Sequence, residues 1–171
     1  KNDSSGQSGP TANRVNHGRA GEEKGKKISQ AIPGHNISLA SLGVFILWFG
    51  WFGFNAGSEL AADGTAALVW VNTTAATCAA MIGWLLVEKF RDGHATSIGA
   101  ASGVVAGLVA ITPAAGAVQP WGALILGTVA SVLCYLAIEM KNKLGYDDTL
   151  DVFGIHGIAA LWGAIGLTFV L

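Results

Sequence analysis

The apolar positions of the chain fall into five long runs separated by short polar segments. The runs occupy about residues 37–57, 66–88, 95–115, 121–140 and 151–171. A helix needs roughly 20 mostly apolar residues to cross the hydrocarbon core of a bilayer, and each run is close to that length. The pattern therefore predicts an all-α fold, a polytopic membrane bundle of five transmembrane helices.

The segment before the first run has a different composition. Residues 1–36 are rich in Gly, Ser, Asn and Lys and have no apolar periodicity, which is typical of a flexible loop. We therefore expect two parts, a flexible loop over residues 1–36 and a five-helix membrane domain over residues 37–171. Asn36 or Ser38 could cap the start of the first helix.

The charges are few and unevenly placed. Hydrophobic residues make up 51% of the chain and charged residues 12%, and the net charge of −1 indicates no nucleic-acid partner. All ten Lys and Arg residues precede the first run, follow the second or follow the fourth, and none lies in loops 57–65 and 116–120. Five spans place these segments on one side of the membrane, which the positive-inside rule makes cytoplasmic. Residues 1–36 are therefore expected in the cytoplasm.

Motifs for other classes of function are absent from the sequence. Cys78 and Cys134 both lie within apolar runs, so neither a disulfide framework nor a metal-type Cys/His spacing is indicated. The sequence contains no nucleophile–base pair and no phosphate-binding loop, so we expect neither an enzyme nor a bound cofactor or metal. A haem or metal site at His156 would need a second ligand, and only the two cysteines lie at a matching depth.

The fifth run carries one ionisable side chain within its apolar stretch, His156. An imidazole inside a membrane span is costly unless it meets a partner or a water-filled cavity, so a functional role is the first interpretation. The alternative is a neutral histidine hydrogen-bonded to a neighbouring helix. Ala159, Ala160 and Gly163 follow at helical spacing on the same expected face. That bare face could pack closely against another helix or border a narrow passage.

Small residues also repeat on the third run. Gly99, Gly103 and Gly107 are four residues apart, so they form a ridge that allows a neighbouring helix backbone to approach closely. We interpret this ridge as helix packing, without contact to a substrate.

The first run has an aromatic face near its end. Leu47, Trp51, Phe54 and Ser58 are spaced four, three and four residues apart, so they share one side of a helix. Such a row can face lipid or pack in a core. It can also attract a small cation through the ring quadrupole or close a pore as an apolar plug.

Three stretches of the sequence together resemble a known family. Trp51-Phe-Gly-Phe-Asn-Ala-Gly-Ser58, Gly107-Leu-Val-Ala-Ile-Thr-Pro-Ala-Ala-Gly116 and Asp151-Val-Phe-Gly-Ile-His-Gly157 are similar, in order and separation, to signature stretches of the ammonium transporter family (Amt/Mep/Rh). The resemblance covers residues 33–171. Most bacterial members have eleven helices, arranged as two inverted five-helix repeats plus a last helix, and assemble as trimers. The resemblance implies that this chain holds helices six to ten, one inverted repeat, with residues 1–36 as the loop between repeats.

The resemblance also assigns roles to residues of this sequence. His156 matches the second member of the pore-lining histidine pair. Phe54 matches one of two phenylalanines that close the outer pore mouth, and Ser58 matches the hydroxyl of the external ammonium recruitment site beside that ring. Trp51 and Thr112 match positions along the pore wall. The expected function is transport of ammonium or ammonia across the cytoplasmic membrane through a narrow hydrophobic pore.

Other features of the family lie outside the sequence. The partner histidine and the second gate phenylalanine belong to the first repeat, and we expect the chain, which begins at Lys1, to be a piece of a longer protein. The resemblance implies a homotrimer, methylammonium as a substrate analogue, and a PII-type regulator contacting a C-terminal tail. The alternative is a receptor-like member that signals ammonium occupancy. Asp151 would lie near the cytoplasmic mouth, where capping of the last helix is an equally good explanation.

Overall fold

The computed structural model describes residues 20–23, 26–29, 36–145, 148 and 150–171. Two short strands, β1 (Ala20–Glu23) and β2 (Lys26–Ser29), pair antiparallel with Ala20 opposite Ser29. The hydrophobic pattern gave no sign of these strands. Apart from these strands and Asn36, the flexible loop expected over residues 1–36 lies outside the described residues, so the loop stays a prediction.

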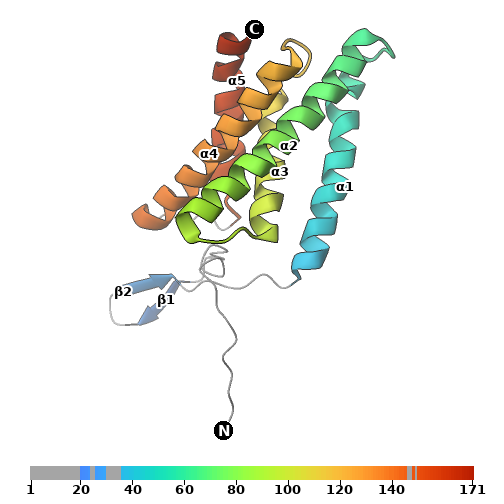
Figure 1. Cartoon of the computed structure of the whole chain (residues 1–171). Coiled ribbons are helices and arrows are strands. Elements are labelled where there is room, and N and C mark those ends of the chain that lie inside the picture. Colours follow the sequence, from blue (N-terminus) through green and yellow to red (C-terminus); the bar gives the residue numbers. More distant parts are fainter. Residues whose placement is uncertain (1–19, 24–25, 30–35, 146–147, 149) are drawn as a thin grey trace.

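The rest of the described chain is a bundle of helices (Figure 1). Its elements are α1 (Ile37–Asn55), η2 (Gly57–Glu59), α2 (Gly64–Asp92), α3 (Ser97–Ile111), α4 (Pro120–Leu144), η3 (Phe153–Gly157) and α5 (Ile158–Val170). Four helical segments, 37–59, 64–92, 120–144 and 153–170, are long and apolar enough to cross a membrane, and α3 is a shorter apolar helix. The expected all-α membrane bundle is confirmed.

The helix ends follow local capping chemistry. The Asn36 side chain accepts a hydrogen bond from the backbone N–H of Leu39 at 2.9 Å, which confirms one of the two caps considered for the first helix. Asp63 caps α2, and Gly93 ends it in the left-handed region at φ 85°. A carboxylate cap and a glycine stop favour these ends. The helix therefore runs beyond the expected 66–88 on both sides.

The third helix is shorter than expected, ending at residue 111 instead of 115. Pro113 lacks a backbone N–H, and the amides of Thr112 and Ala114 bond to carbonyls only three residues back. At 1.5 Å per residue, α3 is only about 22 Å long, against roughly 30 Å for the hydrocarbon core. The irregular backbone after it therefore lies at membrane depth, where its polar groups need partners inside the protein.

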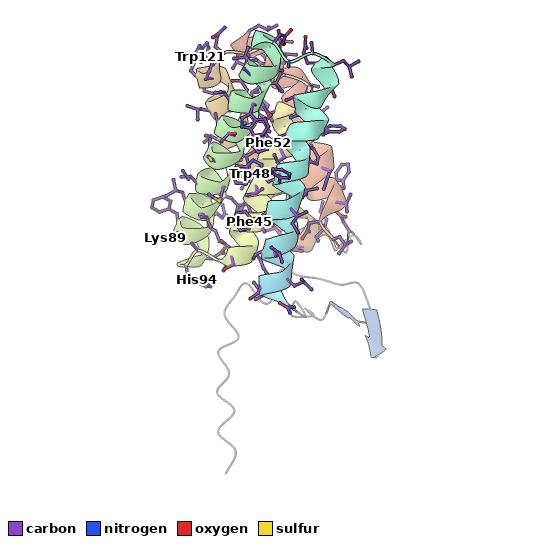
Figure 2. The ribbon with its side chains drawn as sticks, turned by 90° about the vertical axis from the view of Figure 1, so that its right-hand side faces the viewer. Phe45, Trp48, Phe52, Lys89, His94 and Trp121 are labelled. Carbon is purple, nitrogen blue, oxygen red and sulfur yellow. The ribbon has the colours of Figure 1, made fainter. Side chains whose placement is uncertain are left out.

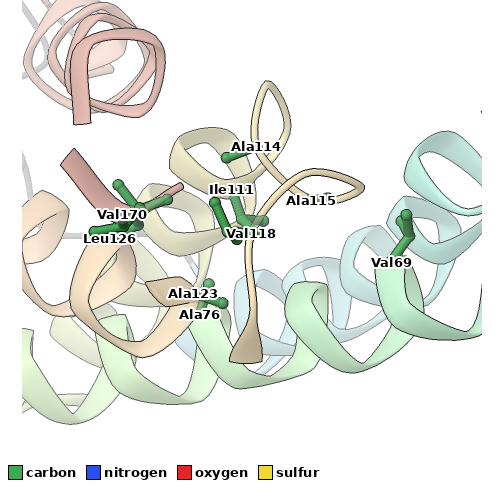
Figure 3. Close-up of a cluster of buried hydrophobic side chains, with 9 residues drawn as sticks. All are labelled: Val69, Ala76, Ile111, Ala114, Ala115, Val118, Ala123, Leu126 and Val170. Carbon is green, nitrogen blue, oxygen red and sulfur yellow. The ribbon is translucent and has the colours of Figure 1, made fainter. Parts of the chain in front are cut away.

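Those partners come from α2. The buried amide of Asn72 donates to the carbonyls of Ala115 and Val118, at 2.8 and 2.7 Å. Buried apolar side chains surround this turn; they are Val69, Ala76, Ile111, Ala114, Ala115, Val118, Ala123, Leu126 and Val170 (Figure 3). The non-helical end of α3 is thus enclosed by α2, α4 and α5.

Glycines let the central helices touch backbone to backbone. A Cβ added at Gly107 would lie 2.7 Å from the Cα of Thr77, and one at Gly103 would lie 2.8 Å from the Cα of Met81. The expected glycine ridge is therefore confirmed as the contact between α3 and α2. Gly99 differs, because a Cβ there would meet the carboxylate of Glu88. That buried carboxylate accepts hydrogen bonds from the N–H and hydroxyl of Thr96, the N-cap residue of α3.

Basic residues gather at one end of the bundle. Lys89 and Arg91 lie in the last turn of α2, and Lys141 and Lys143 in the last turn of α4. Figure 1 shows these two helix ends side by side, and Figure 2 places Lys89 at the end opposite to Trp121. Within residues 36–171, the one-sided charge distribution inferred from the sequence is therefore confirmed.

Candidate functional site

One face of α1 is organised by steps of seven residues. Ile37, Val44, Trp51 and Ser58 are each seven positions apart, and a seven-residue step returns to nearly the same side of a helix. The first two residues line an open groove beside the N-terminal half of α1. The aromatic ring and the hydroxyl continue the same line toward the outer end.

A matching line runs along α3. Ile98 and Val105 line the groove opposite α1, and Thr112 follows seven residues later at the end of the helix. The indole Nε1–H of Trp51 donates to the Thr112 hydroxyl at 3.0 Å. That hydroxyl donates in turn to the carbonyl of Leu108 at 2.8 Å. The two lines therefore converge on a hydrogen bond between two residues singled out in the sequence.

We call the contact between α1 and α3, from the groove to Trp51 and Thr112, the seam. The end of the seam farthest from the groove is aromatic and open. The rings of Trp51 and Phe54 lie 5.2 Å apart between centroids at an interplanar angle of 55°, and Phe54 is 58% exposed. Helix α1 ends at Asn55, two residues before the expected end, so Ser58 lies in η2. The Ser58 hydroxyl donates to the carbonyl of Phe54 at 2.5 Å. Phe54 is therefore not packed among the described residues of this chain.

Asn55 fixes this part of α1 against α2. Its side-chain amide is buried and donates to the hydroxyl of Thr73 at 3.1 Å. One turn earlier, Phe52 stacks on Trp70 of α2 with centroids 3.9 Å apart and planes 7° from parallel. Figure 2 shows Phe52, Trp48 and Phe45 succeeding one another along α1. These polar and aromatic contacts hold the end of α1 that carries Phe54 against α2.

His156 lies at the other end of the seam. It is exposed and borders the groove, which has a volume of about 590 Å³. The groove is lined by α1, α3 and the start of the last helix, through Asn36, Ile37, Leu39, Ala40, Ser41, Val44, Ile98, Ala101, Ser102, Val105, Leu150, Ile155 and His156. The lining is mostly apolar, so the imidazole faces an open apolar space flanked by hydroxyl groups.

The backbone around His156 is a π-helical turn, η3, which the sequence did not indicate. A π-turn accommodates one extra residue in the helix and often marks a functional site. The four residues expected on one face around His156 differ in burial. Ala159 and Gly163 are buried, whereas His156 and Ala160 are exposed. The expected face is therefore divided. Ala159 and Gly163 pack against neighbouring helices, whereas His156 and Ala160 lie on its exposed side.

The packing of α5 against α3 is unusually close. A Cβ added at Gly163 would lie 2.1 Å from the carbonyl oxygen of Ala110. Ala159 is completely buried in the inner apolar cluster of the bundle. The expectation of close helix packing therefore holds for these two residues, and the groove lies on the neighbouring side of the helix.

The connection before the turn is held by two carboxylates and a lysine. Asp148 accepts hydrogen bonds from the N–H groups of Val152, Phe153 and Gly154 at 2.9–3.1 Å. Lys141 is 2% exposed; its Nζ donates to the carbonyl of Asp148 at 2.9 Å and pairs with the carboxylate of Asp151. Capping is therefore performed by Asp148, whereas the side chain of Asp151 pairs with Lys141.

Asp151 also has an uncommon backbone conformation. Its φ of 53° is in the left-handed region, which costs a residue other than glycine roughly 1–2 kcal/mol. Its carbonyl accepts the N–H of Ile155 at 2.8 Å. The chain thus enters the helix of His156 through a strained residue that is held by hydrogen bonds on both sides.

The structure brings some of the expected site residues into contact and keeps others apart. Trp51, Phe54 and Thr112 form one cluster toward the outer end, with Ser58 beside it, and His156 borders the groove that continues this seam. Among the described residues, no group of three or more His, Cys, Asp or Glu could hold a metal ion. Sequence reasoning did not find the pairing of Lys141, because a lysine beside a membrane end is normally a topology marker.

The sequence of this chain is similar to those of known proteins. The family model described as "Ammonium Transporter Family" matches residues 4–171. The chain belongs to the ammonium transporter family. The ammonium transporter of Mycobacterium tuberculosis strain H37Rv is 50% identical over 165 residues, which cover 92% of this chain and 34% of that protein. The ammonium transporter of Aquifex aeolicus is 51% identical over 141 residues, 82% of this chain and 33% of that protein.

Solved structures agree with this membership of the ammonium transporter family. Mep2 from Candida albicans is 37% identical with a TM-score of 0.74, over 81% of this chain and 30% of Mep2. A structure titled "Sensor Amt Protein" is 32% identical with a TM-score of 0.78, over 84% of this chain and 36% of that one. The chain therefore spans about a third of the length of the relatives it matches.

Proposed function

We propose that this chain forms one wall of an ammonium pore, as one five-helix repeat of an ammonium transporter. The observation that carries the proposal is the seam between α1 and α3, where the groove and the aromatic cluster lie along the same lines of the two helices. It begins at the groove of His156 and ends at the contact of Trp51 with Thr112 and the exposed ring of Phe54. These residues face a side of the bundle that the described chain leaves open, where a second repeat would complete the pore.

The chemistry of the seam suits an ammonium cation that sheds its water. Aromatic faces attract small cations by about 0.5–2 kcal/mol, more strongly where water is excluded. The rings of Trp51 and Phe54 with the hydroxyl of Ser58 would recruit external ammonium. Farther in, the groove is mostly apolar, so a bare charge is disfavoured and neutral ammonia is tolerated. We propose that the cation is deprotonated or desolvated at the Phe54 gate.

His156 would then receive the substrate within the apolar passage. A neutral imidazole has one donor and one acceptor nitrogen, so it can bind ammonia, which also donates and accepts. The partner histidine expected from the first repeat would extend this path. Thr112 and Trp51 would line the wall above it, with their polar atoms committed to each other and to Leu108.

Assembly and orientation complete the proposal. We propose a homotrimer in the cytoplasmic membrane, with the basic end of the bundle and residues 1–36 in the cytoplasm. A PII-type regulator would bind a C-terminal tail outside this sequence, and methylammonium would serve as a transported analogue.

The test is the replacement His156→Ala in the full-length transporter, expressed in cells that lack their own ammonium uptake. We expect methylammonium uptake to fall about tenfold or its selectivity to change, since one lost hydrogen bond of about 1.4 kcal/mol corresponds to that factor. His94→Ala is the matched control, because His94 lies between α2 and α3 and does not line the groove. Normal uptake and selectivity in His156→Ala would refute the assignment.

A sensing function is the second candidate, and the likeness to the "Sensor Amt Protein" structure favours considering it. In such a protein, ammonium would occupy the same seam and the occupancy would be passed to a cytoplasmic output domain. Sequencing the gene beyond residue 171 distinguishes the two. An output domain after the next helix, with uptake too slow to support growth on ammonium, would favour the sensor.

A further inference from the structure

The last turn of α4 contains two lysines with opposite environments. Lys143 is exposed, whereas Lys141 is 2% exposed. Burying an ammonium group is costly unless it is paired and hydrogen-bonded. Lys141 meets this condition through the carbonyl of Asp148 and the carboxylate of Asp151. Its charge is therefore committed to the connection that leads into η3.

That connection determines how the last helix begins. The Asp148 carboxylate caps three consecutive N–H groups, those of residues 152, 153 and 154. Asp151 contributes its carbonyl to the N–H of Ile155 while its own backbone remains left-handed. Lys141 contacts both aspartates, so one side chain joins the cap and the strained residue. His156 follows directly, inside the π-turn.

The other end of the π-turn is held by packing. Gly163 lies against the backbone of Ala110, where a side chain at this position would not fit. Within the turn, Gly154 lies against Ile138, and the thiol of Cys134 donates to the carbonyl of Ile155 at 3.4 Å. The position of His156 is therefore determined by α5 on one side and by the aspartate connection on the other.

A π-turn and an α-turn differ by one residue in register. Because an α-helix advances about 100° per residue, closing η3 into a regular α-helix would change the directions of the side chains within the turn, His156 included, relative to α5. The direction of the imidazole depends on what prevents this closure.

We propose that Lys141 is a positioning residue for His156. By binding Asp148 and Asp151 together, it keeps the π-turn open and aims the imidazole into the groove. Its effect on transport rests on the proposed function of the His156 seam, whereas its effect on the backbone of residues 152–158 does not. Lys141 itself touches no substrate in this assignment.

The experiment compares Lys141→Met, Lys141→Arg and the control Lys143→Met in the full-length transporter. Hydrogen exchange measured by mass spectrometry should be about tenfold faster over residues 152–158 in Lys141→Met. Exchange over α3 and the rest of α5 should be unchanged, since their packing does not involve Lys141. Lys141→Arg, which keeps the charge, should recover most of the protection, and Lys143→Met should match the unmodified protein.

Transport gives the second measurement. We expect Lys141→Met to lower the maximal methylammonium rate by up to about tenfold, the loss expected for His156→Ala, with normal membrane abundance. Lys141→Arg should restore much of that rate. If Lys141→Met does not accumulate, Asp151→Asn performs the same test, because asparagine tolerates a positive φ and removes the paired charge.

The outcomes separate the two proposals. Unchanged exchange over residues 152–158 in both Lys141→Met and Asp151→Asn would overturn the positioning role. Faster exchange there, combined with normal uptake in His156→Ala, would support the positioning role and refute the proposed pore function. Faster exchange spread evenly over all helices would also overturn the positioning role of Lys141, since that result would show a general loss of stability.

Discussion

Gly163 provides a direct test of how the helix of His156 is placed. The replacement Gly163→Ala adds one methyl group at the contact between α5 and α3. Its Cβ would lie 2.1 Å from the carbonyl oxygen of Ala110, 2.9 Å from the carbonyl carbon and 3.1 Å from the Cα. All three atoms belong to the backbone, so no side-chain rotation can relieve the overlap.

The size of the effect follows from this distance. Ordinary contact begins at 3.4 Å, so the two helices must separate by about 1.3 Å, the difference between 3.4 and 2.1 Å. Overpacking of this kind typically costs about 1–3 kcal/mol. We therefore expect the free energy of unfolding to fall by about 2 kcal/mol. The melting temperature should fall by roughly 1–3 °C, because the shift of about 2–4 °C per kcal/mol at 150–250 residues decreases with chain length and a full-length relative is about three times as long as this chain.

Two assays on the full-length transporter measure these effects. Thermal unfolding in detergent should show the lowered melting temperature, and methylammonium uptake should fall at temperatures where the protein remains folded, because His156 moves with α5. Gly116→Ala is the control, since its Cβ would meet only Val69 at 3.6 Å and Thr65 at 3.9 Å. A melting temperature and an uptake rate equal to the unmodified protein would refute the close packing of α5 on α3.

Two further predictions concern the turn after α3 and the seam. Asn72→Leu removes the donor to two buried carbonyls, so the free energy of unfolding should fall by about 2–3 kcal/mol. A melting temperature equal to that of the unmodified protein would contradict this account. Trp51→Phe and Thr112→Val each remove the 3.0 Å hydrogen bond between α1 and α3. Both should raise the KM for methylammonium about two- to tenfold, a loss of about 0.5–1.5 kcal/mol, and the double variant should add nothing to the larger single effect. Additive effects would show that the two side chains act separately.

Much of the fold could be predicted from the sequence. Run length determines a helical membrane bundle, because the bilayer requires spans of a set length. The placement of Lys and Arg predicts its orientation, because basic loops mark one side. The glycine ridge at Gly103 and Gly107 was also readable, since a small-residue repeat has one main use between helices. The contact of Trp51 with Phe54 follows from three-residue helical spacing.

Other features depended on contacts between distant segments. The early end of α3 relies on Asn72, which lies more than 40 residues earlier and satisfies the carbonyls that a continued helix would have satisfied itself. The hydrogen bond from Trp51 to Thr112 joins residues 61 positions apart. No local pattern reports such pairs, because the donor and the acceptor are ordinary residues on separate helices.

The sequence determines some features of the surroundings of His156, and the tertiary structure determines the others. The sequence alone determined that an imidazole lies within a membrane-length apolar run, and the similarity of its motifs pointed to the ammonium transporter family. Only the tertiary structure decided which way the imidazole points. Helical periodicity assumes 3.6 residues per turn, whereas the π-turn of η3 is maintained by Asp148, Asp151 and the buried Lys141. A helix can keep such a widened turn only when contacts from other elements compensate for it, so its presence cannot be read from residues 151–171 alone.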